Sequence, residues 1–118
     1  MDPLAAQEFA RHWITAWNAH DLDAVLAHFS SDAVFTSSVA ARIVPESRGV
    51  LVGKEEIRAY WREGLRLLPD LHFELDGVYV GVDAITINYS NERGQRVCEV
   101  LIWNGGLVQR GYATYLEG

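Results

Sequence analysis

The stretch RVCEVLIW, residues 96–103, carries one carboxyl group, that of Glu99, within an otherwise apolar run that follows Arg96. If the Glu99 side chain points into an interior, loss of water raises its pKa, by up to about 3–5 units when burial is complete. Such an acid is neutral near pH 7 and can donate a hydrogen bond to a carbonyl oxygen or exchange a proton. Two alternatives stay open: Glu99 faces water, or it pairs with an arginine such as Arg110. We predict Glu99 as the first catalytic candidate.

Two tyrosines and one serine are the further polar candidates. Tyr89 and Tyr112 can each hydrogen-bond a ligand oxygen beside an apolar ring, although buried tyrosines do this equally for structural partners. Ser37 has no base near it in the sequence, which favours a polar pocket wall over a nucleophile. We predict that Tyr112 assists Glu99 in catalysis and that Tyr89 and Ser37 bind the ligand.

The chain is rich in tryptophan, with four in 118 residues. Three of them lie on predicted helical stripes, for which packing in the core is the default role. In a cavity lined by the first helix, however, some of these rings would contact a flat apolar ligand. The aromatic residues predicted to bind such a ligand are Trp13, Trp17, Phe35, Trp61 and Trp103.

Several ligand classes are not expected. The four histidines show no metal-ligand spacing with cysteines or carboxylates, and Gly105-Gly106 belongs to a turn rather than to a phosphate loop. The net charge of −6 argues against nucleic acid, which requires a basic face. We therefore predict no metal, no cofactor and no nucleic-acid partner.

Length and composition indicate a single soluble domain over residues 1–118. The chain is 49% hydrophobic and 22% charged, as is typical of globular proteins. No apolar stretch approaches the roughly 20 residues that span a bilayer, and the first residues lack the features of a signal peptide. The single cysteine, Cys98, suits a reducing compartment. We expect a cytoplasmic protein that does not bind a membrane.

Helical patterns come first along the chain and strand patterns follow. Apolar residues recur at helical spacing over 3–19, 21–29 and 54–68. Strands are predicted at 32–38, 50–52, 71–75, 85–90, 96–103 and 107–116, with a loop at 39–49 and hairpin turns at 91–94 and 104–106. This order defines an α+β domain with a mostly antiparallel sheet.

Both faces of the strand at 96–103 are apolar. Val97, Glu99, Leu101 and Trp103 share one face, and Cys98, Val100 and Ile102 share the other. Three helices can cover one face only, so a second copy packed sheet against sheet would cover the other. We therefore predict a homodimer through the sheet face.

The element order resembles that of the SnoaL-like branch of the nuclear transport factor 2-like, or ketosteroid isomerase-like, superfamily. The similarity rests on WNAHDLD (17–23), FSSDAVF (29–35), VGKEEIRAYW (52–61) and the WNGG hairpin (103–106). It implies a cone-shaped α+β barrel, with three N-terminal helices packed in a curved sheet around an apolar pocket. It also implies a dimer through that sheet.

The resemblance implies site positions that this chain matches in part. In isomerase-like members, a catalytic aspartate near the end of the first strand corresponds to Ser37 and a tyrosine in the first helix corresponds to Trp13. A protonated acid in the next-to-last strand corresponds to Glu99. In SnoaL-like cyclases, an aspartate in the last strand corresponds to Tyr112. The known reactions therefore do not transfer directly.

Two functions follow as alternatives. The first is a cofactor-free isomerase, cyclase or hydratase that transfers protons on a small carbonyl or polycyclic compound, with Glu99 as acid or base. The second is a non-catalytic module of the same fold that binds a small apolar molecule or dimerises. The missing aspartates favour the second function, and the position of Glu99 in an apolar strand favours the first.

Overall fold

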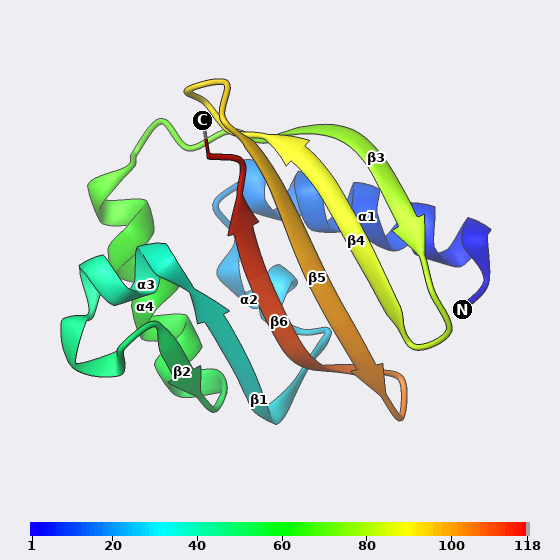
Figure 1. Cartoon of the computed structure of the whole chain (residues 1–118), viewed down its shortest axis with the longest axis horizontal. Helices are drawn as coiled ribbons and strands as arrows, with labels where there is room; N and C mark the ends of the chain where they lie inside the picture. The colour runs from blue at the N-terminus through cyan, green and yellow to red at the C-terminus, as the bar shows by residue number, and fades with distance from the viewer. Residues whose placement is uncertain (118) are drawn as a thin grey trace.

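The computed structural model describes residues 1–117 and arranges helices on one face of a curved sheet (Figure 1). The helices are α1 (Pro3–Asn18), α2 (Leu22–Leu26), α3 (Ser38–Ile43), the 3₁₀ helix η1 (Pro45–Ser47) and α4 (Lys54–Leu67). The strands are β1 (Phe29–Ser37), β2 (Val50–Val52), β3 (Glu74–Val80), β4 (Ala84–Ser90), β5 (Arg96–Asn104) and β6 (Leu107–Tyr115). The predicted α+β class is confirmed.

The six strands of the described chain form one sheet in the order β2-β1-β6-β5-β4-β3. Neighbouring strands are antiparallel except β1 and β6, which run parallel. The sheet curves around the helices without closing into a complete barrel (Figure 1). The cavity between the sheet, α1 and α4 marks the open end of this cone.

Helix α1 is the central element of the helical layer. Asp2 caps its first turn by accepting a hydrogen bond from the Leu4 amide, and Pro3 occupies the first helical position, where no amide donor is needed. The small residues Ala6 and Ala10 are fully buried and let the helix approach the sheet closely. Trp13 extends this buried face towards the open end of the cone.

The segment after β1 differs from the prediction, because residues 38–43 form helix α3 instead of a loop. Ser37 causes this change, since its hydroxyl accepts a hydrogen bond from the Val39 amide at 3.1 Å and so caps the helix. Earlier in the chain, α2 ends at Leu26 and β1 begins at Phe29, so the second helix is shorter than predicted.

The predicted strand at 71–75 is also displaced, since β3 begins only at Glu74. Side chains at and just beyond the end of α1 bind the backbone of residues 71–73, which precedes β3. The Asn18 amide accepts from the Phe73 N–H at 2.7 Å and donates to the Phe73 carbonyl at 2.9 Å. His20 lies 2.9 Å from the Leu71 carbonyl through Nε2. These bonds attach the segment to the helical layer and keep it out of the sheet.

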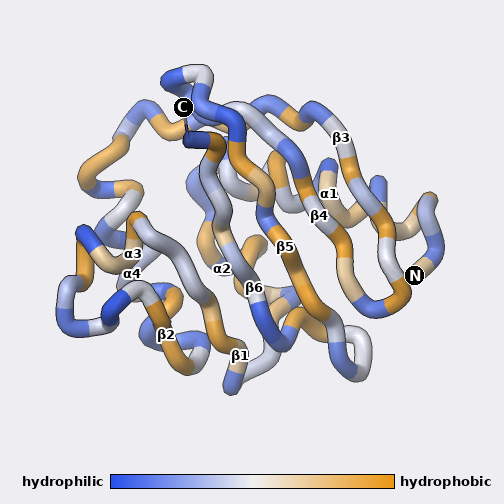
Figure 2. The backbone as a smooth tube through the Cα atoms, in the orientation of Figure 1, coloured by the Kyte–Doolittle hydropathy of each residue, from blue (hydrophilic) through white to orange (hydrophobic). Residues whose placement is uncertain are grey.

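The alternation in β5 sets the two faces of the sheet. Val97, Glu99 and Leu101 are buried against the helices, whereas Cys98, Val100 and Ile102 are half-buried on the opposite, outer face. Figure 2 shows β5 as a mostly hydrophobic strand with a hydrophilic interruption near its middle, where Glu99 lies.

Gly49 lies between η1 and β2 and provides a test of this connection. It has φ +85°, and a Cβ atom at this position would lie 2.9 Å from the Ser37 carbonyl oxygen. Gly94 has φ +78° with open space around it, so it carries the same backbone constraint without the contact. We expect Gly49→Ala to lower the free energy of unfolding by about 2–3 kcal/mol, and Gly94→Ala by about 1 kcal/mol. Urea denaturation checks this, and equal losses would contradict it.

Candidate functional site

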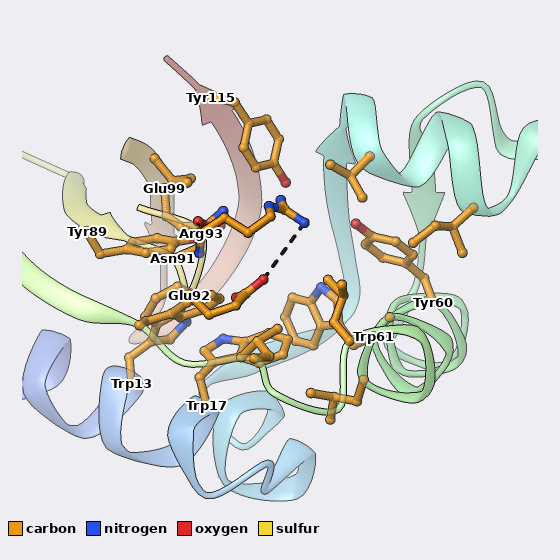
Figure 3. Close-up of a pocket in the computed structure, with 18 residues that line it drawn as sticks. Trp13, Trp17, Tyr60, Trp61, Tyr89, Asn91, Glu92, Arg93, Glu99 and Tyr115 are labelled. Atoms are coloured by element: carbon orange, nitrogen blue, oxygen red, sulfur yellow. Dashed lines mark hydrogen bonds and ion pairs between the residues drawn. The ribbon is translucent and has the colours of Figure 1, made fainter. Parts of the chain in front are cut away.

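A cavity of about 100 Å³ lies at the open end of the cone, between the helical layer and the inner face of the sheet (Figure 3). Its wall is largely aromatic, and α1, α4, β4 and the segment before β3 all contribute to it. The aromatic side chains of this wall are Trp13, Trp17, Tyr60, Trp61, Phe73, Tyr89 and Tyr115. Besides the tyrosines, the ionisable groups that line it are Glu99, Glu92 and Arg93.

Glu99 is the one carboxyl group buried in the wall. It is 6% exposed, and the Tyr89 hydroxyl donates a hydrogen bond to its Oε1 atom at 2.8 Å. Desolvation raises the pKa of Glu99 to about 8, and the Tyr89 hydrogen bond opposes this rise because it favours the charged form. Glu99 is therefore mostly neutral at pH 7. The alternative pair with Arg110 does not form, because Arg110 lies opposite Ile102 on the outer face.

Three tyrosines line the same cavity as neutral hydroxyl groups, and Tyr89 is the one bonded to Glu99. Burial is the main cause that raises the pKa of Tyr89 and Tyr60, and it raises the pKa of Tyr115 to about 12. The Tyr115 hydroxyl lies 3.1 Å from Ser37 Oγ, so the serine that caps α3 also holds this ring in the cavity wall. At neutral pH these hydroxyls can donate hydrogen bonds but cannot serve as bases.

Five of the residues predicted as site residues line the cavity together: Trp13, Trp17, Trp61, Tyr89 and Glu99. The rings of Trp17 and Trp61 meet edge to face, with centroids 4.9 Å apart, and those of Trp13 and Tyr89 lie 5.5 Å apart. The wall is thus preformed by aromatic packing. A flat apolar ligand would contact ring surfaces on several sides.

Tyr112, predicted to assist Glu99, lies outside the cavity. A uniform hairpin from the Asn104-Leu107 pair would place Tyr112 opposite Glu99. A register shift between Ile102 and Trp103 places Ala113 there instead and pairs Tyr112 with Val100 on the outer face. The same shift brings Tyr115 opposite Val97, on the cavity side.

Three more of the residues predicted to bind the ligand lie outside the cavity. Phe35 is buried beneath the cavity, with its ring 5.4 Å from that of Trp61. Trp103 packs edge to face on Phe9 at 4.7 Å and does not line the cavity. Ser37 is 2% exposed and lies behind the wall, where its hydroxyl serves α3 and Tyr115.

Sequence reasoning missed Tyr60, Phe73, Tyr115, Glu92 and Arg93 among the lining residues. Tyr60 and Phe73 belong to apolar patterns that also describe an ordinary core. Glu92 and Arg93 lie in the turn between β4 and β5, for which a solvated position is the usual expectation. Within residues 1–117, no three His, Cys, Asp or Glu side chains gather in a way that could hold a metal ion.

The fold is shared with many solved structures. A SnoaL-like protein of unknown function from Burkholderia thailandensis E264 matches with 42% identity and a TM-score of 0.92, over 98% of each chain. AclR, a putative hydroxylase from Streptomyces galilaeus, matches with 17% identity and a TM-score of 0.76, over 98% of this chain and 91% of its own. TerC, co-crystallised with polyporic acid, matches with 11% identity and a TM-score of 0.77, over 94% of this chain and 91% of its own.

The two matches under 20% identity show the fold alone. No curated protein matches the chain. The family model of the SnoaL-like domain matches residues 10–110, which is most of the sequence. The chain therefore belongs to the SnoaL-like domain family of the nuclear transport factor 2-like superfamily.

Proposed function

We propose that this protein binds a small apolar carbonyl compound in the cavity and catalyses proton transfer on it without a cofactor. The observation that carries this proposal is a neutral, buried Glu99 in an aromatic wall. A carboxylic acid in this state can donate a hydrogen bond to a carbonyl oxygen and stabilise the negative charge that develops there. Isomerisation, cyclisation and hydration all pass through such a step.

The volume of the cavity limits the ligand. An engineered apolar cavity of about 150 Å³ in another protein binds benzene. The present cavity, of about 100 Å³, is smaller, so it suits a compound with at most one small ring that extends into the mouth. A polycyclic compound would need the segments at the mouth to move apart.

Cyclohexanone and methylenecyclohexane provide a matched pair of probes, because they differ mainly in the acceptor oxygen. We expect the ketone to bind more tightly, by about two- to tenfold, since one added hydrogen bond contributes about 0.5–1.5 kcal/mol. Quenching of tryptophan fluorescence measures binding, and loss of the ketone's α-proton NMR signals in D₂O measures proton transfer. Equal affinities would contradict a hydrogen bond from Glu99 to the carbonyl.

A non-catalytic binding module is the second candidate function. The placement of Ser37 and Tyr112 favours it, because neither of these positions puts a base in the cavity. Binding of the ketone without any exchange of its α-protons would select this function over the enzyme.

Two further proposals concern assembly and compartment. A homodimer through the outer sheet face is supported by the half-buried apolar residues of β5 there, Val100 and Ile102. Sedimentation equilibrium tests it, and a monomer at all concentrations would contradict it.

None of the helices in residues 1–117 has the length and apolarity that crossing a bilayer requires. A cytoplasmic location is supported by the single free cysteine, Cys98.

A further inference from the structure

Glu92 is a second carboxyl group at the same cavity. It lies in the turn between β4 and β5, yet only 19% of its side chain is exposed. Figure 3 shows the side chain extending across the cavity mouth, above Trp17 and towards Trp61. A turn glutamate usually extends into water, where its charge is best solvated. The Glu92 side chain instead approaches the space that a ligand would occupy.

The turn that carries Glu92 is firmly built. The Asn91 side-chain oxygen accepts hydrogen bonds from the Arg93 and Gln95 amides, both at 3.0 Å. The backbone closes the turn as well, through the Asn91 N–H to the Gln95 carbonyl at 3.0 Å and the Gly94 N–H to the Asn91 carbonyl at 2.9 Å. The turn therefore fixes the backbone from which Glu92 reaches the cavity, and a positioned catalytic group requires such support.

The Glu92 carboxylate itself remains available. Its one ionic partner in the described chain is Arg93, at 3.8 Å, and Arg93 is 59% exposed, so water screens this pair. No side-chain hydrogen bond to Glu92 occurs within residues 1–117, and its oxygens can accept a proton. Glu99, in contrast, is enclosed and bonded to Tyr89. Two carboxyl groups in such different surroundings are typical of an acid and a base in one site.

We propose that Glu92 is the proton acceptor of the site, acting on a small cyclic ketone whose carbonyl oxygen is bound by Glu99. This inference rests on the proposed function and adds the base that Ser37 and Tyr112 do not provide. The Glu92 carboxylate removes a proton from the carbon next to the carbonyl, so a C–H bond breaks and an O–H bond forms. The electron pair enters a new C=C bond while the carbonyl oxygen takes the Glu99 proton.

The reverse steps return a proton to the same carbon, or to a conjugated one in an unsaturated ketone. The first outcome is hydrogen exchange with solvent, and the second is isomerisation. Neither outcome requires an oxidant, a reductant or a metal, and both carboxyl groups recover their starting states.

The test compares Glu92→Gln with Glu8→Gln, which removes an exposed carboxylate of α1 outside the cavity. We expect Glu92→Gln to slow α-proton exchange of cyclohexanone in D₂O by 10²-fold or more, the range for loss of a general base. Its affinity for the ketone, from tryptophan fluorescence, should change less than threefold. Glu8→Gln should match the wild type, and circular dichroism should show the same fold for all three.

A conservative variant separates a base from a structural residue. Glu92→Asp keeps a carboxylate on a shorter side chain, so it should retain part of the exchange rate that Glu92→Gln loses. Exchange by Glu92→Gln within threefold of the wild type would overturn the inference, while a loss in Glu99→Gln would still support the proposed function. A wild type that binds the ketone without exchange would overturn both.

Discussion

Glu99→Gln should slow α-proton exchange of a bound cyclic ketone by about 10²–10⁴-fold at pH 7, the range typical of a lost general acid. Glutamine keeps the size of the side chain, and its amide oxygen can still accept the hydrogen bond that Tyr89 donates at 2.8 Å. It cannot give up a proton to the carbonyl oxygen. The rate constant of exchange, measured by NMR in D₂O, checks this, together with the ketone affinity.

Tyr89→Phe is the matched control, because it keeps the ring in the wall and leaves the Glu99 proton in place. The Tyr89 hydroxyl lowers the pKa of Glu99, so its removal should raise this pKa further and keep the acid protonated to higher pH. The variant should lose less activity than Glu99→Gln. In the wild type, exchange should decline as the pH rises through about 8, where Glu99 loses its proton. Activity of Glu99→Gln within threefold of the wild type would remove Glu99 from the mechanism.

The placement of Glu99 was predictable because one regular strand determines it. Side chains alternate along β5, so the apolar neighbours Val97 and Leu101 indicate the face that Glu99 shares. Tyr112 was not predictable, because its face depends on pairing with a second strand. One register shift near Trp103 reverses every side chain of β6 beyond it, and nothing in the hairpin sequence marks that shift.

Other inward-facing residues also differ in whether a single element or the packing of several elements determines their position. Trp13 and Trp17 follow from the period of α1 alone, and both line the cavity. Phe35 also points inward, but Trp61 covers it, so inward direction did not mean contact with the cavity. Which inward residues border the empty space depends on the packing of several elements at once, and one sequence pattern does not contain that information.

The role proposed for Glu92 could not be predicted from the sequence, for a related reason. A glutamate in a hairpin turn has the same sequence signature whether its side chain points to water or folds back over a cavity. In this chain the side chain lies over the cavity, and Asn91 holds the backbone of the turn through two hydrogen bonds. The family resemblance implies a base near the end of the first strand, where Ser37 instead caps α3 and holds Tyr115. The proposed site would therefore keep its acid at the position that the resemblance implies and place its second carboxyl group on a different element.

The buried acid should also be measurable without any ligand, as a dependence of stability on pH. The pKa of Glu99 is about 8 in the folded chain against an ordinary value of 4.5. Between these two pH values the folded chain holds a proton that the unfolded chain has released, so the free energy of unfolding falls as the pH rises. At about 1.4 kcal/mol per pH unit, the fall attributable to Glu99 is roughly 5 kcal/mol. The stabilising contribution of neutral Glu99 is complete below about pH 4.5 and lost above about pH 8.

Glu99→Gln should abolish this fall, because glutamine does not titrate. Urea denaturation of both proteins from pH 5 to pH 9 measures this. Across the range, the free energy of unfolding of the variant should rise by several kcal/mol relative to that of the wild type. Other groups titrate in the same interval; burial and His12 lower the pKa of His28, for example, so His28 destabilises the fold as the pH falls. These groups are common to both proteins and cancel in the difference between them. Parallel curves would mean that Glu99 is solvated in the folded chain, and the proposed acid would then lack the neutral state on which its chemistry depends.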